Sequence, residues 1–140
     1  MSVDSSEIDN ALVAKLGADA ALLAIATNGV YWDEAPAGST KFVIVSLVDE
    51  HDEAMFGARA FEDALYLVKM VALSTSGADV KAAAARIDTL LEGGTLTPAG
   101  YRLMVMQRES RIRITEVDDV DASIRWQHRG GQYRVMVSPT

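Results

Sequence analysis

The sequence predicts an α+β domain in which a mainly antiparallel β-sheet is packed with helices on one face. Apolar residues recur with helical spacing near the N-terminus and again over 79–91. Segments typical of strands occupy 42–48, 59–73, 101–115 and 124–137, and they are grouped, not alternated one by one with helices. The chain has 140 residues with no internal repeat or linker, so a single domain spanning 1–140 is expected.

The N-terminal segment has the pattern of an amphipathic helix. Ile8, Leu12 and Leu16 recur every four residues, and Ser5 or Ser6 is placed to cap the first turn. A helix from the cap to about Leu16 is therefore expected.

The next stretch is expected to be short helix, turn and strand. Asp19 can start a second short helix before the turn at Asn28-Gly29, and residues 30–32 form a short extended piece. The β-branched segment 42–48 is predicted to be a buried central strand. The acidic segment 49–57 is predicted to be an exposed connection.

Residues 59–73 fit helix and strand spacing about equally well. A long strand is favoured because the following segment, 79–91, is the clearer helix. It has an aspartate at its start, four consecutive alanines and Gly93-Gly94 after its end.

The C-terminal third is predicted to be β-structure. Residues 101–115 should form one long strand, with a bulge near Glu109-Ser110. Residues 124–137 should form a hairpin or a bulged strand around Gly130-Gly131. Two aromatic residues of this last segment are expected in the core: Trp126 and Tyr133.

Charge is unevenly distributed along the chain. The net charge is −7, but residues 1–100 carry 6 basic and 15 acidic residues, whereas residues 101–140 carry 7 arginines and 5 acidic residues. Such a chain is a poor candidate for coating nucleic acid, which needs basic patches. It could join its neighbours electrostatically, although solvated faces would give the same pattern.

The sequence offers little catalytic chemistry. The chain has no cysteine, which excludes thiolate chemistry and disulfides and fits assembly in the cytoplasm. It also has no phosphate-binding loop and no GxSxG pattern. His51 and His128 are isolated from such motifs, so no enzyme activity and no cofactor are expected. The four acids around His51 could hold a divalent cation, but a solvated loop is favoured because the spacing matches no EF-hand. A small metal- or ligand-binding domain built on His51 is the alternative. No signal peptide or membrane span is expected.

Surfaces between subunits are the better candidates for function. Five arginines on neighbouring predicted strands could form one basic stripe that meets the acidic segments 49–57 and 116–121 of another copy. An ordinary polar sheet face is the alternative. The predicted interface residues are His51, Asp52, Glu53, Phe56, Asp118, Asp119, Arg111, Arg113, Arg125, Arg129 and Arg134.

An ordered set of segments spans nearly the whole chain. They are a helical stretch Ile8–Ile25, Val30-Tyr31-Trp32, a loop with Ala35-Pro36, Phe42–Val45, Tyr66–Leu73, a helix ending Leu90–Gly93, and the closing segment His128–Val135. In this order they resemble the phage tail completion, or tail terminator, proteins, a family of short tail-to-head joining proteins that also occurs in gene transfer agents.

The resemblance implies a homo-hexameric ring at the head-proximal end of the tail in the virion. Such a ring stops polymerisation of the tail tube and offers the surface that joins tail to head, while DNA passes through its lumen unread. The implied partners are other copies of the chain, the major tail tube protein and a head–tail connector or stopper protein. The family brings no catalytic residues. A connector or stopper role is the alternative.

Overall fold

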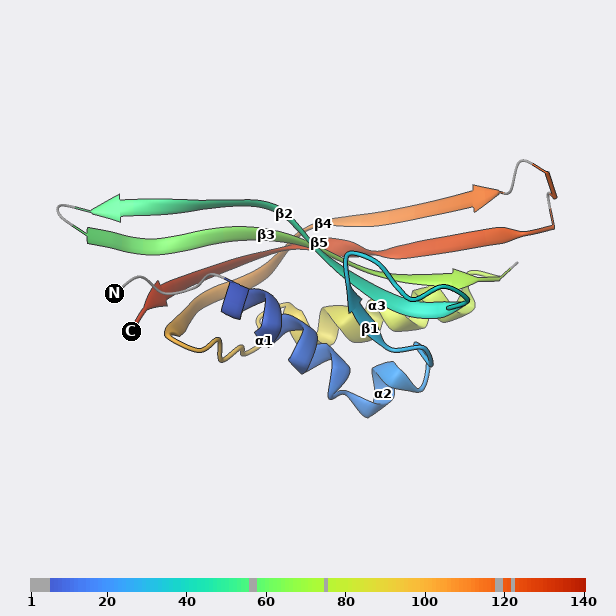
Figure 1. Cartoon of the computed structure of the whole chain (residues 1–140), viewed down its shortest axis with the longest axis horizontal. Helices are drawn as coiled ribbons and strands as arrows, with labels where there is room; N and C mark the ends of the chain where they lie inside the picture. Colours follow the sequence, from blue (N-terminus) through green and yellow to red (C-terminus); the bar gives the residue numbers. More distant parts are fainter. Residues whose placement is uncertain (1–5, 56–57, 75, 118–119, 122) are drawn as a thin grey trace.

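The computed structural model describes residues 6–55, 58–74, 76–117, 120–121 and 123–140, and leaves out the side chains of 51–60. One elongated sheet, with strand order β1-β2-β3-β5-β4, organises the molecule (Figure 1). Along the chain the elements are α1 (Ser6–Gly17), α2 (Ala20–Leu23), β1 (Val30–Trp32), β2 (Lys41–Met55), β3 (Ala58–Leu73), α3 (Ala78–Leu91), β4 (Tyr101–Val117) and β5 (Arg125–Pro139).

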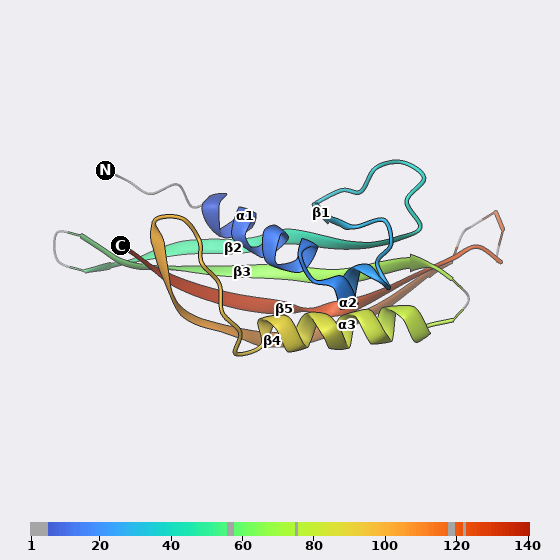
Figure 2. The same cartoon turned by 90° about the horizontal axis from the view of Figure 1, so that it is seen from below.

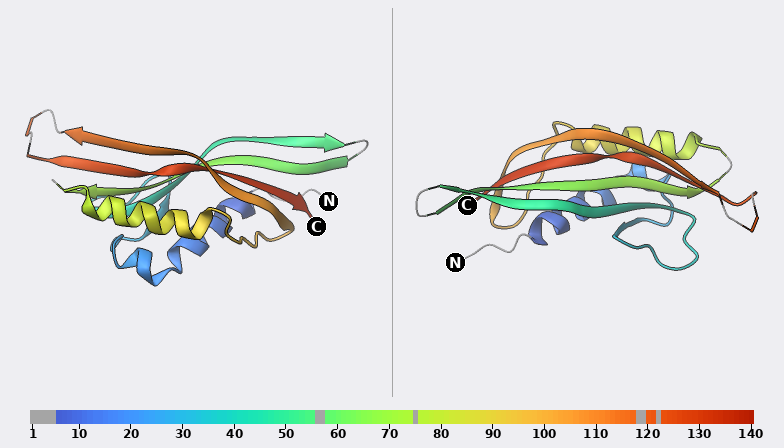
Figure 3. Two further views of the ribbon diagram at one scale, coloured as in Figure 1. Left: turned by 180° about the vertical axis from the view of Figure 1, so that it is seen from behind. Right: turned by 90° about the horizontal axis from the view of Figure 1, so that it is seen from above.

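The helices lie together on one side of the sheet, as the predicted α+β fold requires (Figure 1). Seen from below, α1 lies over β2 and β3, and α3 lies along β5 and β4 (Figure 2). Neighbouring strands are antiparallel except for the short pair β1–β2. None of the described helices lies on the opposite face of the sheet (Figure 3).

The core lies between the helices and the sheet. Ile8, Leu12 and Leu16 of α1 are fully buried, which confirms the predicted stripe. The strands bury every second residue beneath the helices, because successive side chains point to opposite faces. The larger side chains of this layer are Val43, Val45, Tyr66, Val68, Met70, Met106, Tyr133, Val135 and Val137.

The predicted connection at 49–57 is wrong over 49–55, because β2 continues through the acidic segment to Met55. Residues 56–57 lie outside the described part of the chain. β2 pairs with β3 from Asp49 opposite Leu65 to Glu53 opposite Phe61. Backbone hydrogen bonds build an antiparallel ladder whatever the side chains are, so a charged segment can be a strand where it projects beyond the core. The buried part of β2 is correspondingly short, since Leu47 is 41% exposed.

The glycine pair in β5 makes no hairpin. Gly130 and Gly131 sit in an uninterrupted register opposite Lys69 and Val68. The irregularities are instead in β4, where the register shifts between Leu103 and Val105 and again between Arg108 and Ser110. The second shift confirms the predicted bulge near Glu109-Ser110.

The two aromatic residues of β5 lie on opposite faces. Tyr133 is in the core, as predicted, with 1% of its surface exposed. Trp126 lies on the helix-free face, half-buried, with its ring centroid 6.3 Å from that of Phe42. An odd separation of seven residues along one strand forces this division, so the core prediction for Trp126 is wrong.

Candidate assembly surfaces

A basic groove of about 350 Å³ runs between α3 and the middle of strands β4 and β5. We define the basic groove by its cationic lining residues: Lys81 of α3, Arg108, Arg111 and Arg113 of β4, and Arg129 of β5. Lys81 shares one helix face with Ala84, Ala85 and Asp88. The two alanines leave room for the arginine side chains between helix and sheet.

One acidic side chain, Asp88, is built into the wall of this groove. Its Oδ1 accepts hydrogen bonds from Arg108 Nη1 at 2.7 Å and from the Tyr133 hydroxyl at 3.0 Å. The hydrogen bond with Asp88 raises the pKa of Arg108, and burial raises the pKa of Tyr133. Asp88 therefore ties α3 to β4 and β5.

The other arginines of the groove are not engaged in this way. The side chains of Arg111, Arg113 and Arg129 make no ion pair or hydrogen bond with any residue that the structure describes. Arg111 and Arg113 are exposed. Cations held close together without internal partners favour an acidic ligand.

The predicted stripe of five arginines on one face is wrong. Arg111 pairs with Gly131 and Arg113 with Arg129, which places these arginines on the helix side of the sheet. Arg125 is on this side as well, beyond the groove at the start of β5. Arg134 is five residues from Arg129 on the same strand and so points to the helix-free face.

Arg134 is used inside the subunit. Its Nε donates to Glu109 Oε1 at 2.6 Å, and its Nη1 donates to Asp63. Hydrogen bonds to these two carboxylates raise its pKa. Arg134 thus links the three adjacent strands β3, β5 and β4 and does not extend the groove.

The helix-free face carries an apolar hollow of about 460 Å³ beneath the β1–β2 loop. Its apolar lining includes Phe42, Ile44, Leu67, Val71 and Trp126. Exposed Leu73 and Ile114 add to the apolar surface of this face. Contiguous apolar surface of this kind is typical of protein contact sites, so the face is a second candidate assembly surface.

His128 is the buried titratable group of this hollow. Its Nε2 lies 2.6 Å from Glu116 Oε1, and Lys69 also lines the hollow. Burial, followed by the charge of Lys69, lowers the pKa of His128, and Glu116 opposes that shift. Its neutral form is favoured. Ser39 and Ser46 also line the hollow, but no hydrogen bond joins either serine to His128 among the described residues.

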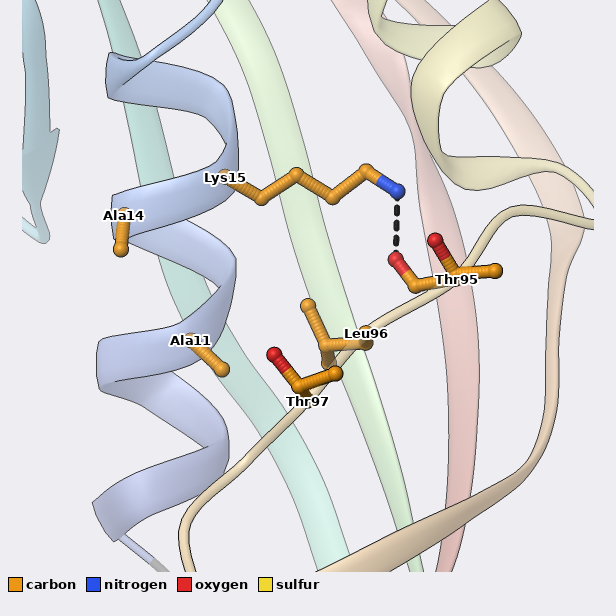
Figure 4. Close-up of a pocket in the computed structure, with 6 residues that line it drawn as sticks. All are labelled: Ala11, Ala14, Lys15, Thr95, Leu96 and Thr97. Carbon is orange, nitrogen blue, oxygen red and sulfur yellow. Dashed lines mark hydrogen bonds between the residues drawn. The ribbon is translucent and has the colours of Figure 1, made fainter.

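A third hollow, of about 420 Å³, lies between α1 and the loop that follows α3. Figure 4 shows Lys15 reaching across it to donate to the Thr95 carbonyl. The remaining lining residues are small or apolar, apart from threonines. The lysine is already bound to the backbone, so this hollow fixes α1 to the loop.

The acidic arm is the part of the β2–β3 hairpin formed by residues 49–63, which holds six acidic residues and one arginine. His51, Asp52 and Glu53 lie in β2 opposite Asp63, Glu62 and Phe61. The side chains of those three predicted site residues lie outside the described part of the chain, as do Phe56, Asp118 and Asp119 altogether.

The described residues show neither a metal site nor a membrane-spanning helix. No group of three or more His, Asp or Glu side chains is placed there to hold a metal ion. No described helix is long and apolar enough to cross a membrane.

Sequence reasoning missed two residues of the groove, Lys81 and Arg108. A signal for Lys81 was available, because it shares a helix face with Asp88, next to the buried stripe of α3. Arg108 precedes a bulge, and alternation cannot be followed through a bulge from sequence alone.

The fold is similar to that of chains in solved structures. A chain of the virion of a native gene transfer agent particle superposes with a TM-score of 0.67 at 24% identity, covering 94% of both chains. The fold is one found in a virion. A second solved structure, 12% identical, has a TM-score of 0.54 over 99% of this chain and 97% of the other. No protein-family model and no curated protein matches the sequence.

Proposed function

We propose that the protein is a structural component of a tailed phage or gene transfer agent particle, and that it forms the ring that terminates the tail tube. The observation that carries the proposal is the shared fold with a chain of a gene transfer agent virion over 94% of both chains. The tail terminator resemblance of the sequence points to the same kind of particle.

The surfaces of the domain support assembly over catalysis. The basic groove, the acidic arm and the apolar helix-free face are three separate surfaces with chemistry suited to protein contacts. In the proposed ring, of about six copies, neighbouring copies contact one another, and other surfaces contact the major tail tube protein and the connector or stopper. The ring sits at the head-proximal end of the tail, and DNA passes through it as cargo.

Particles made without this chain test the proposal. Electron microscopy should show tails of irregular, excessive length, and supplying the gene in trans should restore normal length. Tails of normal length that fail to join heads would indicate a connector or stopper instead. Complete particles of normal length would overturn a structural role at this junction.

The mass of the purified protein gives an independent measurement. Sedimentation or native mass spectrometry should find a closed oligomer of about six copies, alone or with the tail tube protein. A strictly monomeric protein that is also absent from particles contradicts the ring. If the alternative built on His51 were right, His51→Ala with Asp52→Ala and Glu53→Ala would abolish metal binding and leave assembly unchanged.

A further inference from the structure

Four cationic side chains line the basic groove without an acidic partner. They are Lys81 of α3, Arg111 and Arg113 of β4, and Arg129 of β5, here called the cation cluster. Their side chains make no ion pair or hydrogen bond with any described residue. We propose that the cation cluster is a phosphate-binding site whose ligand carries more than one negative charge. This inference goes beyond the proposed ring and does not depend on it.

The strand register places two of these arginines directly against each other. Arg113 is opposite Arg129 in the antiparallel pair β4–β5, on the helix side of the sheet. Like charges directly opposite on neighbouring strands destabilise a sheet. An anion bound between the two guanidinium groups replaces this repulsion with attraction, and each guanidinium offers a fork of N–H donors that matches the oxygens of a phosphate.

Lys81 brings a third cation to the same place from the helix. A smaller hollow, of about 260 Å³ at the start of α3, adjoins the groove and shares Lys81, Arg113 and Arg129 with it. These three side chains therefore lie where the two hollows meet, and they come from the helix and from both strands. Arg111 lies two residues before Arg113 on the same face of β4, about 7 Å along the strand, and extends the positive surface into the groove.

The two acidic residues of α3 are already engaged and do not neutralise the cluster. Asp88 accepts hydrogen bonds from Arg108 and Tyr133. Asp79, in the first turn of the helix, pairs with Lys41 at 2.8 Å. Among the described residues that line either hollow, Asp88 is the only acid. The charge of the cluster is therefore available to a ligand.

The charge balance favours phosphate over a single carboxylate side chain. Elsewhere in the molecule one guanidinium serves one carboxylate, as in Arg86 with Asp19, and Arg134 serves two. Four cations match an anion of higher charge, whose oxygens point in several directions. A phosphate group has these properties, and a chain of phosphates has them more strongly. The backbone of a nucleic acid and a free polyphosphate share this chemistry, and the experiments distinguish the two sources.

Titration calorimetry with inorganic pyrophosphate provides the first test. The wild-type protein should bind it, and Arg113→Glu should weaken binding about tenfold or more at physiological salt. Arg102→Glu is the matched control, because it makes the same charge change at an exposed β4 arginine outside both hollows. The control should change the affinity less than twofold. Wild-type protein that binds no pyrophosphate, or equal losses in the two variants, overturns the inference.

Urea denaturation gives a second test with a different readout. In phosphate-free buffer Arg113→Glu should raise the urea midpoint, because it places a carboxylate opposite Arg129 in place of a like charge. Pyrophosphate should raise the midpoint of the wild type and of Arg102→Glu but not that of Arg113→Glu, because a ligand stabilises only the fold that binds it. If Arg113→Glu gains as much from pyrophosphate as the wild type does, the anion binds elsewhere and the proposed site is wrong.

Two labelled probes distinguish the possible ligands by fluorescence anisotropy. Binding of a double-stranded DNA oligonucleotide that is weakened by Arg113→Glu, with a shallower dependence on salt, supports the site and assigns it to a nucleic-acid backbone. Binding of pyrophosphate without DNA supports the site and assigns it to a free phosphate compound. A hexaglutamate peptide that binds through Arg113 while neither phosphate probe does overturns the inference in favour of an acidic protein segment.

These outcomes are separate from those of the proposed function. A monomeric protein that binds pyrophosphate through the cation cluster supports this inference and contradicts the ring. Rings of normal mass that bind neither phosphate probe overturn this inference and leave the terminator proposal unchanged.

Discussion

Gly130 of β5 lies directly against the backbone of Val68 in the neighbouring strand β3. A Cβ built on Gly130 would sit 2.1 Å from the Val68 carbonyl oxygen and 2.6 Å from Lys69 Cα. On the other side of β5, a Cβ on Gly131 would sit 2.7 Å from the Ser110 carbonyl oxygen of β4. The glycine pair therefore lets β5 pass between β3 and β4 at a point where backbone atoms of both strands leave no room for a side chain.

Gly130→Ala should accordingly destabilise the protein. The new methyl group meets backbone atoms, which cannot move aside as a flexible side chain would. We expect a loss of about 1–3 kcal/mol or more in the free energy of unfolding, measured by urea denaturation. Gly17→Ala is the control, because nothing lies within 4 Å of a Cβ there, and its effect should be neutral or slightly stabilising. Equal effects of the two substitutions would contradict the close approach.

Periodicity predicted the elements that bury one face. The helices α1 and α3 were predictable because Leu12 and Ile87 belong to regular apolar patterns that end on the shared core. The strand β3 was predicted from its place before the clearer helix, because the spacing of apolar residues in 59–73 fits helix and strand equally well. The resemblance to the tail terminator proteins rested on the order of these segments and not on any one motif.

The elements without a buried face were not predictable in the same way. The acidic half of β2, which includes Asp52, has no alternation of apolar and polar residues. Its sequence pattern is therefore the same as that of an exposed loop. Once β5 is known to run uninterrupted, alternation of its side chains places Arg129 and Arg134 on opposite faces of the sheet. The same alternation places Trp126 and Tyr133 on opposite faces. Sequence left that point open, because Gly130-Gly131 is equally typical of a turn.

Asp19 and Arg86 should control the stability of the helical layer in acid. Asp19 Oδ2 accepts from Leu22 N at 2.9 Å and from Arg86 Nε at 2.7 Å, and Oδ1 accepts from Arg86 Nη2 at 2.6 Å. The hydrogen bond with Arg86 is the main cause that lowers the pKa of Asp19 from 3.8 to about 2. The stabilisation is complete above about pH 4 and is lost as the pH falls towards 2.

Urea denaturation from pH 2 to 6 measures this contribution. Asp19→Asn should lower the urea midpoint at pH 6 and flatten its fall between pH 4 and 2, because the carboxylate that titrates is gone. Arg86→Gln should reproduce much of the loss, and the double variant should be little worse than either single one, since both remove the same contact. Fully additive losses would show that the two side chains act separately.

Asp88 should matter for stability as well as for the groove. Asp88→Ala leaves the buried Tyr133 hydroxyl without its acceptor, and an unmade buried hydrogen bond costs about 1–3 kcal/mol. Tyr133→Phe removes the donor and should cost less, about 1 kcal/mol. Placing Phe at position 133 in Asp88→Ala should then recover part of the loss. A further loss in the double variant, measured by the same urea titration, would rule out this pairing.

His128 should make folding sensitive to pH in the neutral range. Burial first, and then Lys69, lowers its pKa in the folded protein below the ordinary 6.5, with Glu116 opposing. The unfolded chain therefore takes up a proton at His128 at a higher pH than the folded chain does. Stability should be constant above about pH 7 and should fall as the pH drops through 6.5 towards 5. His128→Gln should remove that fall in urea denaturation. His51→Gln, which changes the other histidine of the chain, should retain it, and the reverse result would assign the dependence to the acidic arm.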